Sequence, residues 1–139
     1  MKTDYNKLNI GDRLVRTKKG IFSRHHALYA GIVNNKHMVA ENQVNRGVQY
    51  ITLQQFMSEG RLDRIEYNGF NRREQSIIIQ RINEKIKKRT KYSLLKYNCE
   101  HFANEILTGV VKSKQIRVGS AIAATLTLLF VLTRNKNKQ

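Results

Sequence analysis

Proline and tryptophan are absent from this chain of 139 residues, and cysteine occurs once. A single cysteine cannot form an internal disulfide, which excludes a disulfide scaffold and is compatible with a reducing compartment. Without proline, the turns must be formed by glycine, asparagine and aspartate. The length is typical of one domain, and a hydrophobic content of 40% is sufficient for a core.

Acidic side chains are scarce as well, because 10 of them stand against 26 lysines and arginines, for a net charge of +16 at pH 7. A charge of this size favours anionic partners such as lipid head groups or nucleic acid. No aromatic-rich RNA-binding signature and no zinc-finger spacing accompany it. We therefore expect a phospholipid membrane as partner and no nucleic acid. The alternative is a basic surface that keeps the domain soluble.

The C-terminal part differs from the rest of the chain. Residues 118–132 contain no charged side chain, although Arg117 precedes them and Arg134 follows them. The stretch is apolar all round rather than on one face, which favours a membrane anchor over a helix docked on the domain. We expect a domain over residues 1–112 and a membrane-anchor segment over residues 113–139. The protein would then be tail-anchored, with the domain in a reducing, cytoplasmic compartment and lysines and arginines against acidic lipid.

The periodicity of the first half is typical of strands, and that of the second half is typical of helices. An Asn34–Asn35 pair predicts a hairpin turn, since asparagine tolerates positive φ. Strands followed by helices predict an α+β fold with an antiparallel sheet packed against helices. The expected strands are a short one ending at Lys18, His25–Val33, His37–Asn42, Gly47–Leu53 and Asp63–Tyr67, and the expected helices are Gln54–Glu59, Asn71–Arg89 and one beginning near Cys99.

The single cysteine lies in the segment "YNCEHFANEIL", residues 97–107. Asn98 is a favourable N-cap, so Cys99 falls in the first turn of a helix, where the helix dipole favours a thiolate. Helical spacing places Cys99 on the apolar face with Phe102 and Ile106, which points it at the sheet. A histidine on the facing strand could then act as its base. The alternative is a small core residue, which an inward cysteine on an apolar face often is.

Four segments resemble one known family. "NCEHFAN" closely resembles the Asn-Cys-Glu-His-Phe-x-Asn signature of the lecithin–retinol acyltransferase family, and "HHALYAG", residues 25–31, is similar to its histidine strand. "IGDRLVR" and "GVQYITLQQF" resemble its opening strand and its Gly-Val segment. The resemblance runs in order over nearly the whole chain, and it implies a circularly permuted, NlpC-type, papain-like fold.

The resemblance also implies the residues of an active site. Cys99 takes the place of the nucleophile and His25 that of the general base. His26 stands where the family has an aromatic residue, and we expect it on the opposite face of the strand. The group that orients His25 is either Glu41 or His37, depending on the alignment; we favour Glu41 and keep His37 as the alternative.

The expected activity is acyl transfer or hydrolysis on acyl esters of membrane glycerophospholipids, through a thioester on Cys99, with a lipid donor and a lipid, amine or water acceptor. No cofactor and no metal are expected, because Cys99 and His101 lack the second cysteine pair of a structural zinc site. We read His101 as a structural residue. One alternative is an NlpC-type cysteine peptidase or amidase. Another is a non-catalytic, membrane-tethered basic interaction domain.

Overall fold

A computed structural model describes residues 4–18 and 21–110 of the chain. The predicted anchor segment, 113–139, lies outside these residues. Within the part that is described, no helix is long and apolar enough to cross a membrane.

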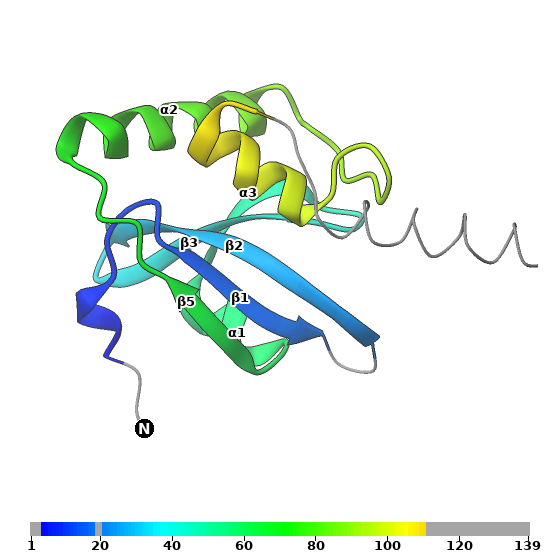
Figure 1. The fold of residues 1–139 in the computed structure, drawn as a ribbon, viewed down its shortest axis with the longest axis horizontal. Coiled ribbons are helices and arrows are strands. Elements are labelled where there is room, and N and C mark those ends of the chain that lie inside the picture. Colours follow the sequence, from blue (N-terminus) through cyan, green and yellow to red (C-terminus); the bar gives the residue numbers. More distant parts are fainter. Residues whose placement is uncertain (1–3, 19–20, 111–139) are drawn as a thin grey trace, which may run out of the picture.

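Five antiparallel strands form one sheet in the order β4-β3-β2-β1-β5, with the long strand β2 in the middle (Figure 1). The strands are β1 (Arg13–Lys18), β2 (Ile21–Val33), β3 (Lys36–Gln43), β4 (Gly47–Thr52) and β5 (Leu62–Glu66). A short 3₁₀ helix, η1 (Tyr5–Lys7), precedes them. The predicted central strand is therefore confirmed, although it begins four residues earlier than expected.

Within the described ranges, three α-helices cover the two faces of the sheet. They are α1 (Leu53–Ser58), α2 (Arg72–Lys87) and α3 (Cys99–Thr108). Figure 1 shows α2 and α3 together on one side of the sheet and α1 on the other. The predicted α+β class with an antiparallel sheet is confirmed; that the fold is a circular permutation of the papain-like arrangement stays a prediction.

Each face of the sheet has its own apolar cluster because successive strand residues point to opposite sides. Under α2 and α3 the cluster includes Leu28, Ile82 and Phe102, and under α1 it includes Leu14 and Phe56. The sheet thus separates two cores. A residue of β2 belongs to one core or the other according to its parity.

Asparagine and glycine form the turns, as the lack of proline predicts. Asn34 and Asn35, between β2 and β3, have φ values of 49° and 60°. Gly11, before β1, has a φ of 93°, and a Cβ there would lie 2.6 Å from side-chain atoms of Ile78 and Phe70. Glycine is required at this position both for the backbone angle and for the close approach of α2.

The end of β4 differs from the expected Gly47–Leu53 because Thr52 stops the strand. Its side chain accepts a hydrogen bond from the backbone N–H of Gln55, and Gln55 bonds back to the backbone N–H of Thr52. This capping box begins α1 at Leu53, one residue before the predicted helix.

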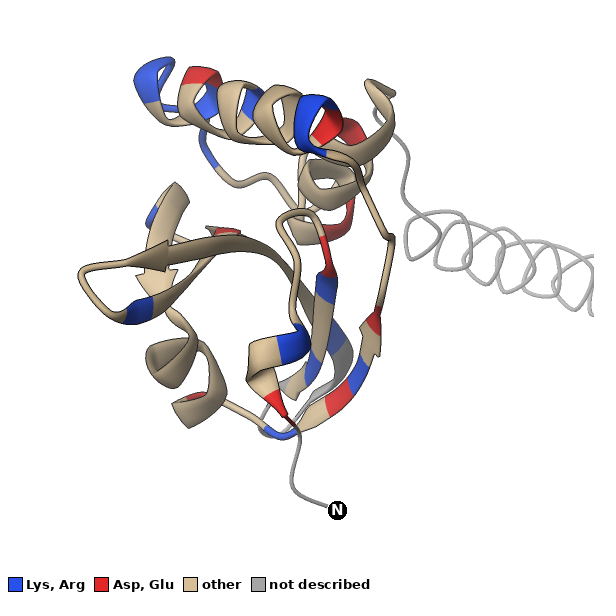
Figure 2. Ribbon diagram, turned by 90° about the vertical axis from the view of Figure 1, so that its left-hand side faces the viewer, with Lys and Arg blue, Asp and Glu red and all other residues tan. Residues whose placement is uncertain are grey.

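Basic residues lie on several elements of the described structure rather than on one. Figure 2 shows basic segments recurring along α2, and alternating basic and acidic segments along β5. On β5 the opposite charges pair locally, as between Arg64 and Glu66 at 2.9 Å. The excess positive charge is therefore most evident on α2 and in the segment that follows it.

Candidate active site

The cysteine begins helix α3, as predicted. Asn98 caps the helix: its Oδ1 accepts the backbone N–H groups of Glu100 and His101, both at 3.0 Å. His101 completes a capping box, because its Nδ1 accepts the backbone N–H of Asn98 at 3.2 Å. The structural role expected for His101 is thus confirmed. The cap places Cys99 in the first turn, with only 1% of its surface exposed.

His25 and Glu41 form a fully buried pair on β2 and β3. The distance between His25 Nε2 and Glu41 Oε2 is 2.7 Å, and both side chains are 0% exposed. Glu41 pairs across the strands with Ala27, which puts it diagonally opposite His25 on the same face of the sheet. The second carboxylate oxygen, Oε1, accepts a hydrogen bond from Gln49 Nε2 at 3.0 Å.

His37, the alternative partner, does not contact His25 in the structure. Its Nδ1 is hydrogen-bonded to the hydroxyl of Tyr29 at 2.7 Å. The β2–β3 register shifts between Tyr29 and Gly31, and His37 pairs with Ile32 near the hairpin turn. The geometry therefore places Glu41, and not His37, where it can orient the imidazole.

The N-terminus of α3 meets β2 beside His25. Cys99 Sγ lies 3.9 Å from the carbonyl oxygen of Arg24, the residue before His25. The pairing of β2 with β3 reaches as far as Ala27, so His25 lies just beyond it, at a part of the strand that the first turn of α3 can approach. From β3, Asn42 Nδ2 donates to the carbonyl oxygen of Tyr97 at 2.9 Å and fixes the segment before the helix.

The three side chains are coupled electrostatically. Burial lowers the pKa of His25, but a side-chain hydrogen bond and charge from Cys99, followed by those of Glu41, raise it more, so its pKa lies above the ordinary value of 6.5. Burial raises the pKa of Glu41, but the hydrogen bond and charge of His25 lower it more, helped by Gln49 and Arg16, so its pKa lies below 4.5. The pair therefore favours imidazolium and carboxylate over the neutral forms.

The two ring nitrogens of His25 have different surroundings. Nε2 is bound to Glu41, whereas Nδ1 is buried and makes no hydrogen bond of ordinary geometry to the described residues. Nδ1 is therefore the nitrogen open to the thiol.

The sequence did not reveal two residues that surround the His25–Glu41 pair, Arg16 and Gln49. Arg16 is buried and donates to the carbonyl oxygen of Glu59 at 2.9 Å and to its carboxylate at 2.6 Å. Its guanidinium lies 4.9 Å from the ring centre of Phe56, and that ring lies 5.9 Å from the ring of His25. No local motif indicates Arg16 or Gln49. Strand pairing is the signal that could have found Gln49, because Gln49 is directly opposite Glu41.

His26 lies on the other face of β2, as expected from strand parity. Burial, and next the positive charge of Arg13, lower its pKa from 6.5 to about 4. Arg13 in turn donates to Asn104 Oδ1 at 2.6 Å and so joins β1 to α3. His26 is thus a neutral residue under α3 at pH 7, and it is not oriented toward Glu41.

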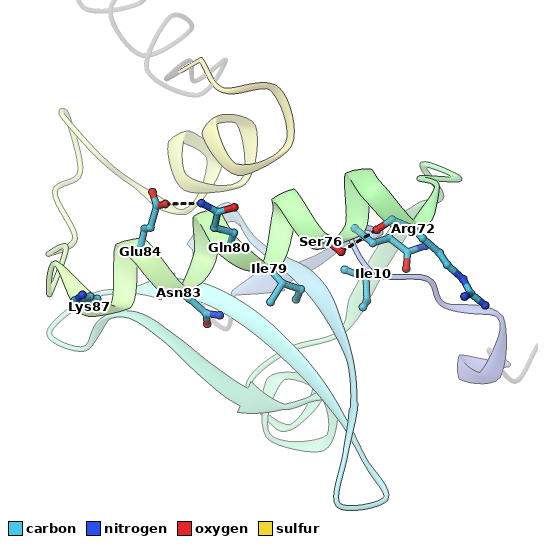
Figure 3. Close-up of a pocket in the computed structure, with 9 residues that line it drawn as sticks. Ile10, Arg72, Ser76, Ile79, Gln80, Asn83, Glu84 and Lys87 are labelled. Atoms are coloured by element: carbon cyan, nitrogen blue, oxygen red, sulfur yellow. Dashed lines mark hydrogen bonds between the residues drawn. The ribbon is translucent and has the colours of Figure 1, made fainter.

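A separate hollow of about 770 Å³ runs along α2. Figure 3 shows Ile10 and Ile79 within it and Arg72 and Lys87 toward its two ends. None of Cys99, His25 and Glu41 lines it. Among the described residues, no group of three His, Cys, Asp or Glu side chains is placed to hold a metal ion.

Comparison with known proteins identifies the family of the chain. The family model described as "Lecithin retinol acyltransferase" matches residues 6–112. Curated relatives named "Phospholipase A and acyltransferase 3" from Homo sapiens and Pongo abelii are each 36% identical over 72 residues, covering 46% of this chain and 44% of each relative. The matched part thus spans less than half the length of these relatives. Since the family model covers most of the chain, the protein belongs to the lecithin retinol acyltransferase family.

Proposed function

We propose that this protein is a cysteine-dependent acyltransferase or phospholipase A that acts on acyl esters of glycerophospholipids. The observation that carries the proposal is the buried His25–Glu41 pair, 2.7 Å apart, beside a cysteine at the tip of α3. A nucleophile, a base and a third group that orients the base are the parts that nucleophilic acyl transfer needs. The names of the relatives support this choice of reaction and substrate.

In the first half of the reaction, the thiol proton of Cys99 lies on Nδ1 of His25, so that a thiolate faces an imidazolium. The thiolate attacks the ester carbonyl carbon, and a carbon–sulfur bond forms. The backbone N–H of Cys99, at the positive end of the helix, stabilises the negative charge that develops on the carbonyl oxygen. The carbon–oxygen bond of the ester then breaks, and His25 gives its proton to the leaving alcohol, which leaves a thioester on Cys99.

In the second half, an acceptor completes the transfer. His25, again neutral, takes a proton from water, an amine or an alcohol, and the acceptor attacks the thioester carbonyl. The carbon–sulfur bond breaks, and the proton held by His25 returns to the sulfur. Water as acceptor gives a phospholipase A, and an amine or alcohol gives an acyltransferase. Glu41 does not transfer a proton in this scheme; it holds the imidazole in place and favours its charged form.

The expected setting is the surface of a membrane in a reducing compartment. The net charge of +16 attracts the protein to anionic lipid, and the apolar stretch at residues 118–132 would hold it there. A free cysteine as nucleophile requires that the thiol stay reduced. Confinement to the plane of the substrate would raise the local concentration of acyl donor.

A direct test looks for the thioester. The purified protein is incubated with a phospholipid that carries a labelled acyl chain, and the intact mass is measured before and after treatment with hydroxylamine. We expect one acyl group per chain, removed by hydroxylamine, and none on Cys99→Ala. Persistence of the same adduct and turnover in Cys99→Ala would overturn the proposal. A parallel panel of cell-wall peptides tests the amidase alternative.

A further inference from the structure

Two leucines just before the cysteine helix are left in solvent. Leu94 is 66% and Leu95 is 72% exposed, which makes them the most exposed large apolar side chains of the described residues. They stand between the exposed lysines Lys91 and Lys96. Isolated exposed leucines are common. An adjacent pair between lysines, just before the helix that begins with Cys99, requires an explanation.

The turn that carries these leucines is held rigidly. Ser93 and Tyr97 exchange two backbone hydrogen bonds of 2.9 Å, which close the turn at its base. The Tyr97 hydroxyl donates to the carboxylate of Glu105 at 2.5 Å. Asn98, the cap of α3, also donates from Nδ2 to the carbonyl oxygen of Leu94 at 3.2 Å. The exposure of the leucines therefore belongs to an ordered turn.

A basic hollow lies next to this turn. It has a volume of about 530 Å³, no carboxylate side chain lines it, and three of its lining residues are Arg46, Arg89 and Lys91. Arg46 also forms an ion pair with Glu59, whose Oε1 lies 3.7 Å from Arg46 Nη1. The β3–β4 turn and the segment after α2 meet here, because the backbone N–H of Val48 donates to the carbonyl oxygen of Thr90 at 3.2 Å. Figure 1 shows this end of the sheet beside the loop that leads into α3.

We propose that the Leu94–Leu95 turn and the basic hollow together form the surface that docks on a bilayer containing anionic phospholipid. The leucines enter the boundary between head groups and acyl chains. The three cations, Arg46, Arg89 and Lys91, bind lipid phosphates in the head-group layer. A bilayer presents apolar depth beneath a plane of negative charge, which is the arrangement that this surface complements. Two leucines are too little apolar area for a stable protein interface of the usual size.

The turn lies next to the cysteine helix, so docking also affects the reaction. This part of the inference rests on the proposed function. Asn98 bonds both to Leu94 and to the first turn of α3. Docking through the leucines therefore brings the end of α3 that carries Cys99 to the lipid interface. The opposite end of the sheet, with the β2–β3 hairpin, would face away from the bilayer.

The absence of tryptophan allows a local test in the full chain. Leu95→Trp and, as a matched control, Ile32→Trp each introduce a single tryptophan at an exposed apolar position, the control in the β2–β3 hairpin. Each variant is mixed with phosphatidylcholine vesicles, with and without phosphatidylserine, that carry bromine on the acyl chains. We expect blue-shifted, bromine-quenched emission from Leu95→Trp with phosphatidylserine, and unchanged emission from Ile32→Trp.

Equal quenching of the two probes, or none at position 95, would overturn the proposal. A blue shift of Leu95→Trp that grows with protein concentration without lipid would indicate a second copy as the occupant, and would overturn it too. Replacing Arg46, Arg89 and Lys91 with glutamine in the Leu95→Trp background should weaken vesicle binding about fivefold per cation. The same measurements on a Cys99→Ala background need no catalysis, so failure of acyl transfer and failure of docking are distinguished.

Discussion

His25 and His26 are adjacent in the chain but lie in opposite electrical environments. The His25 side chain lies on the α1 face, and there Glu41, together with Cys99 from the tip of α3, overcomes the effect of burial and favours the charged form. On the α2 and α3 face, burial and the charge of Arg13 favour the neutral form of His26. Parity along one strand is thus sufficient to give two histidines opposite properties.

Replacing each histidine should separate catalysis from structure. We expect His25→Ala to lower kcat/KM on a phospholipid substrate by about 10³-fold, since it removes the proposed base. His26→Phe should change kcat/KM by less than about threefold, because an aromatic residue suits that position and His26 does not contact Glu41. Steady-state kinetics on the two folded variants measure both values. Equal losses for the two variants would contradict the contrast.

The stability of the protein in acid should depend on His26. Its pKa is about 4 in the folded state against 6.5 when exposed, so the unfolded chain binds a proton first as the pH falls. The free energy of unfolding should therefore decrease between pH 6.5 and pH 4, by about 3 kcal/mol from this residue. Urea unfolding at several pH values measures the loss, and His26→Phe should remove that part of it.

The contribution of His25 to stability should vary with pH in the opposite direction to that of His26. The pKa of His25 is raised, so its contribution to stability is present below pH 6.5 and is lost as the pH rises through the raised value. The pKa of Glu41 is lowered, so its contribution is present above pH 4.5 and is lost as the pH falls through the lowered value. The pair is therefore most stabilising between pH 4.5 and pH 6.5. In the same range, protonation of His26 in the unfolded chain already lowers the free energy of unfolding.

Glu41 and His37 can be compared directly. We expect Glu41→Gln to lower kcat/KM by about 10²-fold and to lower the pKa of His25, because the carboxylate raises it. His37→Ala should leave both the rate and that pKa nearly unchanged. Kinetics, together with NMR titration of the imidazole protons, provides both readouts. A larger loss for His37→Ala than for Glu41→Gln would reverse the assignment.

The smallest effect is expected for Gln49. Its amide bonds to Glu41 Oε1, so Gln49→Ala should loosen the carboxylate and lower kcat/KM by about fivefold to tenfold. Gln54→Ala changes an exposed residue of the same type and serves as the control. If both variants lose the same activity, Gln49 does not act through Glu41.

Local patterns in the sequence predicted much of the fold. The Asn34–Asn35 turn and the cap at Asn98 are properties of a few neighbouring residues, and the structure has both. The ends of β4 and β2 were predicted less well. The Thr52 capping box competes with the strand, and the early start of β2 depends on its pairing with β1.

The site was predictable to the extent that the family resemblance and strand parity could indicate it. Strand parity could not decide whether Glu41 or His37 orients His25, because both residues lie on the same face of β3. Their positions along the strand pair separate them, because Glu41 is opposite Ala27 whereas His37 is opposite Ile32, near the hairpin turn. That register includes an irregularity between Tyr29 and Gly31, which no residue pattern predicts. Arg16 and Gln49 reach the site from other strands, so their roles depend on the assembled sheet.

The near-complete burial of Cys99 has a kinetic consequence for any reagent that attacks sulfur. Modification must wait for the protein to open around the thiol, so the rate of alkylation should rise with reagent concentration and then level off. The plateau would equal the rate at which α3 and its surroundings separate. A protein carrying this thiol would then resist brief exposure to an oxidant, while lipid that holds the site open would make the same sulfur reactive.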